Sequence, residues 1–358
     1  MIHQYLNTKP YSMNNDVKRE IMLEDLNQLT QHHYSNCKEY RQIIDGLWNG
    51  KILAKKTEDL PFIPVSLFKS HQLSSVKKED IRSTMTSSGT TGQTVSKIYI
   101  DNQTSQYQQK GLANSLQHIL GKKRLPMMIL DTDACFKNPE YMNARGAGVL
   151  GMMRYGRNHC FALSSDLEPD LKAIEDFLKI NGSAPFFIFG FTFLVWTKFY
   201  ELLKNSNLDL TNGVLIHSGG WKKMIENAVD NDVFRRSFKQ DFKLSRIYNF
   251  YGMVEQLGSI ILEGSDGLLY PPNFGDVIIR DPKTLEVVPD GKKGIIQVLS
   301  IIPQSYPGHS ILTEDIGVIE KTDRSKDDWS GCGLRIIGRV PKTDLRGCSD
   351  IISQKMSS

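Results

Sequence analysis

The chain has 358 residues, of which 40% are hydrophobic and 9% aromatic, a composition typical of a globular protein with a sizeable core. Its net charge of +4 is spread along the sequence, so we expect no nucleic-acid partner. The apolar stretches are too short to span a bilayer, the N-terminus lacks a secretory signal, and the five cysteines form no C-x-x-C pair, so we expect a cytoplasmic protein with reduced thiols and no transmembrane segment.

The first part of the chain predicts helices that lead onto a sheet. Apolar residues recur at helical intervals over residues 16–47, and the proline-containing segment 59–68 predicts an extended connector. A short strand is predicted at 97–100 and a helix at 106–120. Residues 126–131 then predict a buried strand that ends in a carboxylate.

The alternation of strands and helices continues through the middle of the chain. Helices are predicted at 167–180 and 194–203, and strands at 186–189 and 213–217, which indicates an α/β fold with a largely parallel sheet. After residue 258 the composition shifts to β segments joined by turns, at 277–280, 294–299 and 317–319. We therefore predict four parts, namely a helical region with a connector (1–75), an α/β core (76–258), a β-rich subdomain (259–337) and a short tail (338–358).

Residues 86–97 are the most informative segment of the sequence. They combine hydroxyl groups with two glycines and end in Lys97. Glycines let backbone N–H groups turn inward, and serine and threonine hydroxyls add further donors, so the segment predicts a loop that holds phosphate oxygens. Its spacing is not that of a P-loop, and the alternative is an ordinary turn between two strands. The candidate phosphate-binding residues are Thr86, Ser87, Ser88, Gly89, Thr90, Thr91 and Gly92.

Two later clusters complement this loop. In the first, Tyr251 and Gly252 precede Glu255. An aromatic ring beside a glycine can lie flat on a purine, and a carboxylate can hold Mg²⁺, which prefers oxygen ligands and substrate phosphates. In the second, Asp315 is a candidate to accept hydrogen bonds from the two hydroxyls of a ribose, the alternative being an acidic turn.

Together these segments resemble the motifs of the adenylate-forming enzymes, which activate carboxylates with ATP. Residues 86–97 resemble their T-S-S-G-T-T-G-x-x-x-x-K signature, and residues 251–255 resemble Y-G-x-T-E, with Val254 in place of the usual threonine. Residues 313–315 resemble their [ST]-G-D motif, with Glu314 in place of glycine. The resemblance covers most of the chain and implies ATP and Mg²⁺ as cofactors, with Glu255 as the metal ligand.

The resemblance also assigns residues that the sequence alone would not. Gly219 and Gly220 match the G-G loop that lines the adenine site, and Arg339 matches the arginine of the G-R motif that reaches the nucleotide. The implied fold is the large N-terminal domain of these enzymes, with mixed and parallel sheets flanked by helices and a smaller β subdomain. The mobile C-terminal domain, which carries a catalytic lysine, has no room before residue 358, so we expect it to be absent and Lys97 to be a candidate replacement.

The C-terminal tail, with residues 59–69 and 217–223, is similar to the acyl-protein synthetase family, the ATP-dependent component of a fatty-acid reductase complex in luminous bacteria. That family passes an acyl group from AMP to a cysteine near its C-terminus, a position that Cys348 matches. A thiolate attacks an acyl-adenylate readily, and the neighbouring Arg346 would lower the pKa of this thiol. The resemblance implies a fatty acid substrate and an acyl-reductase or acyl-carrier protein as partner.

Several alternatives remain open at this point. The acyl acceptor could be coenzyme A or a carrier protein, as in the related phenylacetate–CoA ligases, or the chain could be a non-catalytic adenylate-binding homologue. Residues 186–196 form either an ordinary core strand and helix or part of a tunnel for an acyl chain. His217 is either a core histidine at a strand end or an acid–base group.

Overall fold

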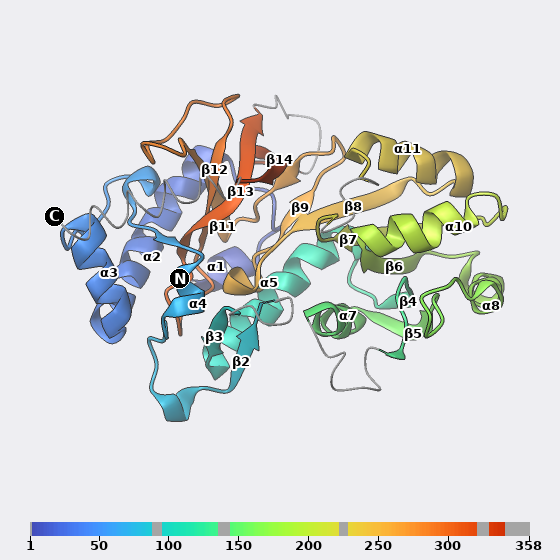
Figure 1. The fold of residues 1–358 in the computed structure, drawn as a ribbon, viewed down its shortest axis with the longest axis horizontal. Helices are drawn as coiled ribbons and strands as arrows, with labels where there is room; N and C mark the ends of the chain where they lie inside the picture. Colours follow the sequence, from blue (N-terminus) through green and yellow to red (C-terminus); the bar gives the residue numbers. More distant parts are fainter. Residues whose placement is uncertain (1, 88–94, 135–143, 222–227, 321–328, 341–358) are drawn as a thin grey trace. The chain divides into compact units, whose positions relative to one another are not determined.

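The computed structural model describes residues 2–87, 95–134, 144–221, 228–320 and 329–340 (Figure 1). The chain divides into two compact units. Unit 1 comprises residues 1–115, 252–261 and 268–358, and unit 2 comprises residues 116–251 and 262–267. Within the described ranges, no helix is both long and apolar enough to cross a membrane. The four-part division expected from the sequence stays a prediction.

Unit 2 contains a five-stranded parallel sheet, as the alternation of strands and helices predicts. Its order is β5-β4-β6-β7-β8, and each neighbouring pair runs parallel. The strands are β4 (Leu125–Ile129), β5 (Gly156–Phe161), β6 (Phe186–Phe191), β7 (Gly213–Ser218) and β8 (Arg246–Tyr251). The winding reverses between β4 and β6, and ligands of open parallel sheets bind beyond the carboxyl ends of the strands near such a reversal.

Helices of unit 2 bury one face of this sheet in an aromatic core. They are α8 (Leu171–Asn181), the continuous run α9 (Thr192–Leu194), η4 (Val195–Tyr200) and α10 (Glu201–Leu203), and α11 (Asn231–Phe242). The predicted helix at 194–203 is confirmed in extent, but its middle, η4, is a π-helix. The tract 186–196 supplies Phe186, Ile188, Val195 and Trp196 to this core, as the structural alternative expects. Because side chains alternate along a strand, Phe191 points to the other face, where it lies against Gly148 of α7 (Ala144–Met153).

Unit 1 is built on an antiparallel sheet. Its order is β11-β12-β13-β14-β10, and β1 (Ile63–Pro64) pairs in parallel with β13. The strands are β10 (Leu269–Tyr270), β11 (Gly275–Arg280), β12 (Gly294–Ser300), β13 (Ser310–Glu320) and β14 (Gly333–Arg339), while β9 (Ile261–Glu263) lies where the chain passes between the units in sequence. The predicted strands at 277–280 and 294–299 are confirmed. The strand predicted at 317–319 is only the end of β13, because paired backbone carries the polar residues 313–315 as well.

The N-terminal helical region is α1 (Ile2–Leu6), α2 (Asn15–Asn36) and α3 (Lys38–Trp48). The break between α2 and α3 falls at Cys37, whose backbone is extended and whose Sγ accepts a hydrogen bond from the Tyr40 N–H at 3.4 Å. The predicted connector is wrong at its ends, because η1 (Thr57–Asp59) and α4 (Leu67–Ser70) are helical turns. The chain turns after Pro64, since the Phe68 N–H donates to the Val65 carbonyl at 3.2 Å.

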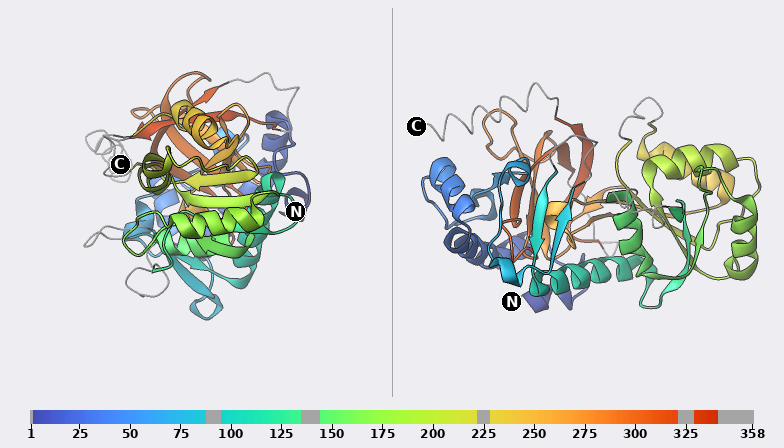
Figure 2. Two further views of the ribbon diagram at one scale, coloured as in Figure 1. Left: turned by 90° about the vertical axis from the view of Figure 1, so that its right-hand side faces the viewer. Right: turned by 60° about the horizontal axis from the view of Figure 1, so that its bottom comes forward.

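A separate two-stranded hairpin in unit 1 carries the ends of the predicted phosphate loop (Figure 2). It consists of β2 (Ser83–Thr86) and β3 (Lys97–Ile100), and it follows the short turn η2 (Lys78–Asp80). The strand predicted at 97–100 is therefore confirmed. The next helix, α5 (Asn102–Leu120), begins where the Asp101 carboxylate accepts a hydrogen bond from the Thr104 N–H at 2.7 Å, which satisfies one of the free donors of its first turn.

Candidate active site

The hairpin fixes both ends of the predicted phosphate loop. Thr86 pairs with Lys97 as the last ladder pair, and both are exposed. Beyond them, the Ser87 N–H donates to the Ser96 carbonyl at 3.2 Å, and the Ser96 N–H donates to the Ser87 Oγ at 3.0 Å. The expected phosphate ligands between these ends, Ser88, Gly89, Thr90, Thr91 and Gly92, lie outside the described residues. Thr86, Ser87 and Lys97 therefore stand at the mouth of the loop, as a phosphate site requires.

Glu255, the predicted metal ligand, is a buried carboxylate in unit 1. It lies in the turn η6 (Val254–Gln256) and is 5% exposed. The next residue is anchored, because the Gln256 Nε2 donates to the carbonyl oxygens of Val298 at 3.2 Å and Gly308 at 2.8 Å. Burial raises the pKa of Glu255, and the Ser96 hydroxyl and the positive charge of Lys69 act against this rise. No cation of the described residues lies within ion-pair distance of this carboxylate.

These residues fit a magnesium ion that also binds substrate phosphates. The donors are oxygens, which Mg²⁺ prefers, and the buried charge of Glu255 lacks a counter-charge that a cation would supply. Among the described residues, no three His, Cys, Asp or Glu side chains gather into a metal cluster. A magnesium ion here would therefore be held by Glu255 together with phosphate oxygens and water, the arrangement that this ion ordinarily adopts.

Asp315 and Arg339, both expected at the nucleotide, face each other across two strands of unit 1. They form a register pair of β13 and β14, and the Arg339 Nε lies 3.4 Å from the Asp315 Oδ1. Arg339 is 77% exposed and Asp315 is 18% exposed. Thr313 fixes the strand, since its hydroxyl donates to the Ile296 carbonyl at 2.8 Å and accepts from the Asp315 N–H at 3.1 Å. The alternative of an acidic turn is wrong, because residues 313–315 lie within β13.

In unit 2, the predicted adenine-site residues meet at the carboxyl ends of two neighbouring strands. Gly219 and Gly220 follow β7 directly, and Tyr251 is the last residue of β8. The Ser218 hydroxyl donates to the Phe250 carbonyl at 2.9 Å and ties these ends together. Gly219 has a φ of +89°, a conformation that favours glycine, and it leaves the backbone open to a ligand. Gly252, the remaining predicted residue, begins the following segment of unit 1.

His217, one residue before the Ser218–Gly220 loop, is a buried and neutral histidine. Its Nδ1 lies 2.9 Å from the Thr192 Oγ1, and its ring stacks on Phe234 at 4.5 Å between centroids. Burial lowers the pKa of His217 to about 3, with the charge of Arg235 contributing. This pKa makes the imidazole a poor proton acceptor at neutral pH, which argues against the acid–base alternative.

Two residues near these groups have no role in the sequence-based prediction. Glu263 accepts hydrogen bonds from Asn231, from the Arg235 Nη1 at 2.8 Å and from the Asn249 N–H at 2.6 Å, and so holds β8 against α11. Nothing in the sequence marks it, since its partners are distant along the chain. Ser96 lies at the base of the predicted phosphate loop and interacts with Glu255. Its position directly before Lys97 is the one feature of the sequence that could have identified it.

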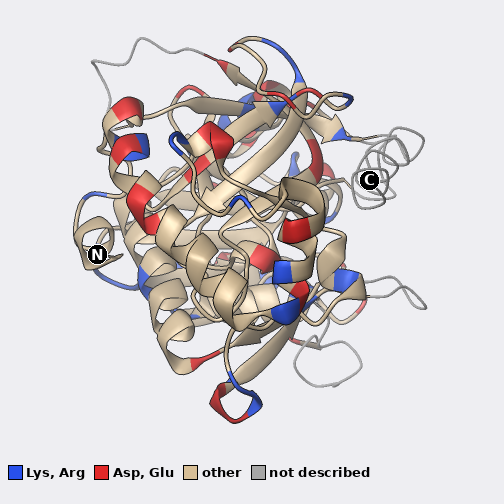
Figure 3. Cartoon of the chain, turned by 90° about the vertical axis from the view of Figure 1, so that its left-hand side faces the viewer, with Lys and Arg blue, Asp and Glu red and all other residues tan. Residues whose placement is uncertain are grey.

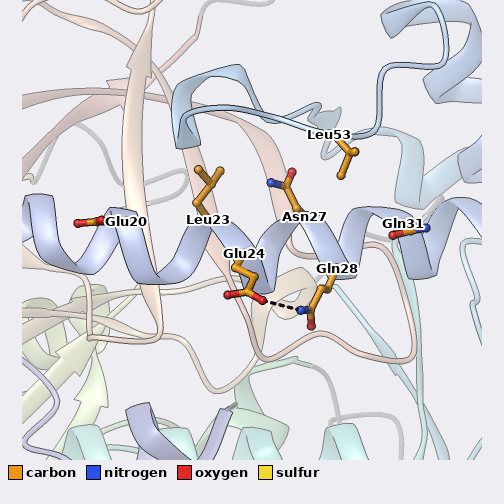
Figure 4. A pocket seen from close by; sticks show the side chains of 7 residues that line it. All are labelled: Glu20, Leu23, Glu24, Asn27, Gln28, Gln31 and Leu53. Atoms are coloured by element: carbon orange, nitrogen blue, oxygen red, sulfur yellow. Dashed lines mark hydrogen bonds between the residues drawn. The ribbon is translucent and has the colours of Figure 1, made fainter.

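Other surfaces of unit 1 do not share these features. Figure 4 shows an open groove along α2 in which Gln28 donates to Glu24 at 3.3 Å, and none of the predicted site residues lines it. In the view of Figure 3, the positions of Lys and Arg residues along the ribbon are interspersed with those of Asp and Glu residues. The groove residues are Glu20, Leu23, Glu24, Asn27, Gln28, Gln31 and Leu53.

Comparisons with known proteins identify the family of the chain. The profile of the family described as acyl-protein synthetase, LuxE, matches residues 2–357. The chain is 24% identical to the long-chain-fatty-acid–luciferin-component ligase of Vibrio harveyi, over 92% of this chain and 86% of that protein. It is also 24% identical to the ligase of the same name from Aliivibrio fischeri, over 96% of this chain and 90% of that protein.

Solved structures support the same fold. Crystal structures of 2-hydroxyisobutyryl-CoA ligase match with a TM-score of 0.65 and 15% identity. The match covers 92% of this chain and 69% of the ligase in the postadenylation state in complex with 2-HIB-AMP. In an open conformation in complex with 2-HIB-AMP and CoA, the match covers 76% of the ligase chain. The fold is therefore that of the adenylate-forming ligases, and the chain belongs to the acyl-protein synthetase (LuxE) family of ligases.

Proposed function

We propose that this protein is an ATP-dependent fatty acid–protein ligase that forms an acyl-AMP and then a thioester on its own Cys348. The observation that carries the proposal is the family match over residues 2–357. Two of the relatives are named long-chain-fatty-acid–luciferin-component ligases, which supports a long-chain fatty acid as substrate. The gathering of Ser96 and Glu255 behind the ends of the phosphate loop supports ATP as the other substrate.

In the first step, a carboxylate oxygen of the fatty acid attacks the α-phosphorus of ATP, the bond to the bridging oxygen breaks, and pyrophosphate leaves. Donors from the loop that begins at Thr86 and Ser87, with Lys97 at its end, would hold the phosphate oxygens as charge develops. Magnesium would neutralise phosphate charge when bound at Glu255. Asp315 would accept hydrogen bonds from the ribose hydroxyls. Its ion pair with Arg339 can open for this, because the Arg339 side chain is exposed.

In the second step, a thiolate attacks the acyl carbonyl carbon and AMP leaves as the carbonyl re-forms, which gives a thioester. The three cysteines that the structure describes do not suit this role, because burial raises the pKa of Cys37, that of Cys160 to about 11 and that of Cys332 to about 12. Thiols with raised pKa are poor nucleophiles at neutral pH. Cys135 and Cys348 lie outside the described residues. Of these two, Cys348 is the proposed acceptor, because its position near the C-terminus matches the acceptor cysteine of the family that the sequence resembles.

The thioester then needs a second protein to receive or reduce the acyl group. An acyl-reductase or an acyl-carrier protein has the required chemistry, and the word "luciferin-component" in the names of the relatives favours the reductase. The cytoplasm is the compartment that we propose for this reaction, because a free thiol acceptor needs reducing surroundings.

Intact-mass analysis after incubation with Mg-ATP and a panel of carboxylic acids tests the proposal. We expect a hydroxylamine-labile acyl adduct on the wild type and on Cys160→Ser, and none on Cys348→Ser. An adduct that persists on Cys348→Ser would move the acceptor elsewhere. If AMP and pyrophosphate form only when coenzyme A or a carrier protein is added, the acyl acceptor is that added thiol and not Cys348. If no AMP forms under any of these conditions, the proposal that the protein is a ligase is overturned.

A further inference from the structure

A cluster of buried polar side chains surrounds Glu255 within unit 1, and we call this cluster the Glu255 pocket. It is formed by Glu255, Ser96, Gln108 and Tyr306. Ser96 and Tyr306 are completely buried, and Glu255 is 5% exposed. The four residues come from separate elements, namely the base of the β2–β3 hairpin, α5, the turn η6 and the segment before β13. The fold thus brings together side chains that are up to about two hundred positions apart in sequence.

Tight glycine contacts fix the walls of this pocket. A side chain on Gly308 would collide with the ring of Tyr306 and with the carbonyl oxygen of Glu255, so both pack against this glycine. On another side, Gly258 has a φ of +90°, and a Cβ there would lie 2.6 Å from the Gln108 Cα. The backbone of η6 and that of α5 are therefore in direct contact through the residues that follow Glu255.

The pocket contains buried polar groups that reach no partner with full hydrogen-bond geometry among the described residues. The Ser96 Oγ, the Gln108 Nε2 and the Tyr306 hydroxyl are buried, and none completes a hydrogen bond within the described ranges. Burial raises the pKa of Tyr306, the charge of Glu255 raises it further, and the Gln108 side chain acts against both. The Tyr306 hydroxyl therefore interacts with both Glu255 and Gln108. Unused buried donors cost stability, and a protein that retains three around one carboxylate gains something other than stability from them.

We propose that Ser96, Gln108 and Tyr306 are positioning residues that hold the Glu255 carboxylate in the orientation in which it binds magnesium-ATP. This inference rests on the proposed function. All three are neutral donors, so they orient the acceptor oxygens of Glu255 directly or through water without neutralising its charge. The full negative charge stays available to a cation, whereas a lysine or arginine in the same place would cancel it. Ser96 also links this pocket to the phosphate loop, because its backbone exchanges two hydrogen bonds with Ser87.

The test measures metal binding and stability separately. Mn²⁺ binding is followed by electron paramagnetic resonance in the presence of a non-hydrolysable ATP analogue, and urea unfolding is followed on the metal-free protein. The variants are Tyr306→Phe and Ser96→Ala. The matched control is Tyr40→Phe, which removes another fully buried hydroxyl of unit 1 that has no hydrogen-bond partner among the described residues.

We expect Tyr306→Phe and Ser96→Ala each to weaken Mn²⁺ binding by about tenfold, the size typical of groups that orient a metal ligand. The urea midpoint of Tyr306→Phe should be unchanged or higher, because an unused buried hydroxyl is lost. Tyr40→Phe should keep wild-type Mn²⁺ binding. Wild-type Mn²⁺ binding in both pocket variants would overturn the inference and leave the proposed function standing. A wild type that binds no Mn²⁺ with the nucleotide would overturn both.

Discussion

Among the buried carboxylates of unit 1, Asp276 and Glu255 are held in opposite ways. Asp276 is 1% exposed and lies 3.2 Å from the Lys18 Nζ and 2.7 Å from the Arg19 Nε. Burial acts to raise the pKa of Asp276, but Lys18 and Arg19 lower it below its ordinary value. Glu255 is 5% exposed, has no ion-pair partner among the described residues, and has a raised pKa although the charge of Lys69 acts against the rise.

The difference separates a charge that is paired within the protein from one that the proposed function pairs with magnesium. Lys18 and Arg19 are on α2, and Asp276 is on β11, so this ionic cluster attaches the helix to the sheet. Its two positive charges are balanced by Asp276 and by Glu58, whose Oε1 lies 2.8 Å from the Arg19 Nη1. Glu255 lies beside the anchored Gln256, but among the described residues no cation lies within ion-pair distance of its carboxylate. A buried carboxylate without an ion-pair partner is costly, and under the proposed function the magnesium ion that accompanies ATP supplies this partner.

The largest expected effect comes from breaking the balanced cluster. Asp276→Asn leaves the charge of Lys18, which is 1% exposed, buried without a full partner. We expect the free energy of unfolding to fall by about 3–5 kcal/mol, measured by urea denaturation. The double variant Lys18→Met, Asp276→Asn should recover part of this loss, because the buried ammonium is also gone. A loss below about 1 kcal/mol would show that the cluster behaves like an exposed ion pair.

Removing the charge of Glu255 should lower activity without lowering stability. In Glu255→Gln we expect acid-dependent exchange of pyrophosphate into ATP to fall by about a hundredfold or more, because charge stabilisation at the phosphates is lost. The free energy of unfolding of the ligand-free protein should not fall, since the variant no longer buries a charge. A variant that loses stability as much as activity would make Glu255 a structural residue like Asp276.

The stability of the protein in acid depends on buried histidines, which stay neutral in the folded chain. Burial lowers the pKa of both His217 and His309 to about 3, the latter also under the influence of His32. Below the ordinary histidine pKa of about 6.5, the unfolded chain binds protons that the folded chain does not. Stability should therefore decrease as the pH falls from about 6.5 towards 3, by up to about 1.4 kcal/mol per pH unit for each histidine.

The contribution of one histidine can be isolated with His309→Gln, which keeps a polar side chain that cannot titrate. The slope of unfolding free energy against pH should be smaller in this variant than in the wild type between pH 6.5 and 4.5. Equal slopes would mean that His309 is protonated in the folded protein.

The smallest effect is expected at the exposed edge of β13. Asp315→Asn should raise the KM for ATP by about tenfold with little change in unfolding free energy, because one charge-assisted hydrogen bond to ribose is weakened. Arg339→Ala removes the other member of this ion pair and serves as the comparison. If Asp315→Asn leaves the KM unchanged, the ribose is held by another residue.

Local patterns predict most of the elements but not the Glu255 pocket. The strand at 97–100 has a turn-forming segment before it and alternating burial, so its bounds are correct. β13 is predicted only in part, because its pairing with β1, β12 and β14 overrides the low strand propensity of Glu314 and Asp315. The π-helix in η4 leaves no local signal, and Gln108 and Tyr306 meet Glu255 only through contacts that are distant in sequence.

The pairing of β13 has a consequence for how the protein moves. This strand of 11 residues pairs with β12 at residues 310–312 and again at Ile316 and Gly317, with β14 from Asp315 to Glu320, and with β1 at Ile311 and Leu312. Its amides should exchange with deuterium only in the deepest opening of unit 1. We therefore expect the backbone of Asp315 to stay in place during the catalytic cycle. Any movement at this position should be a change in the side-chain rotamers of Asp315 and Arg339.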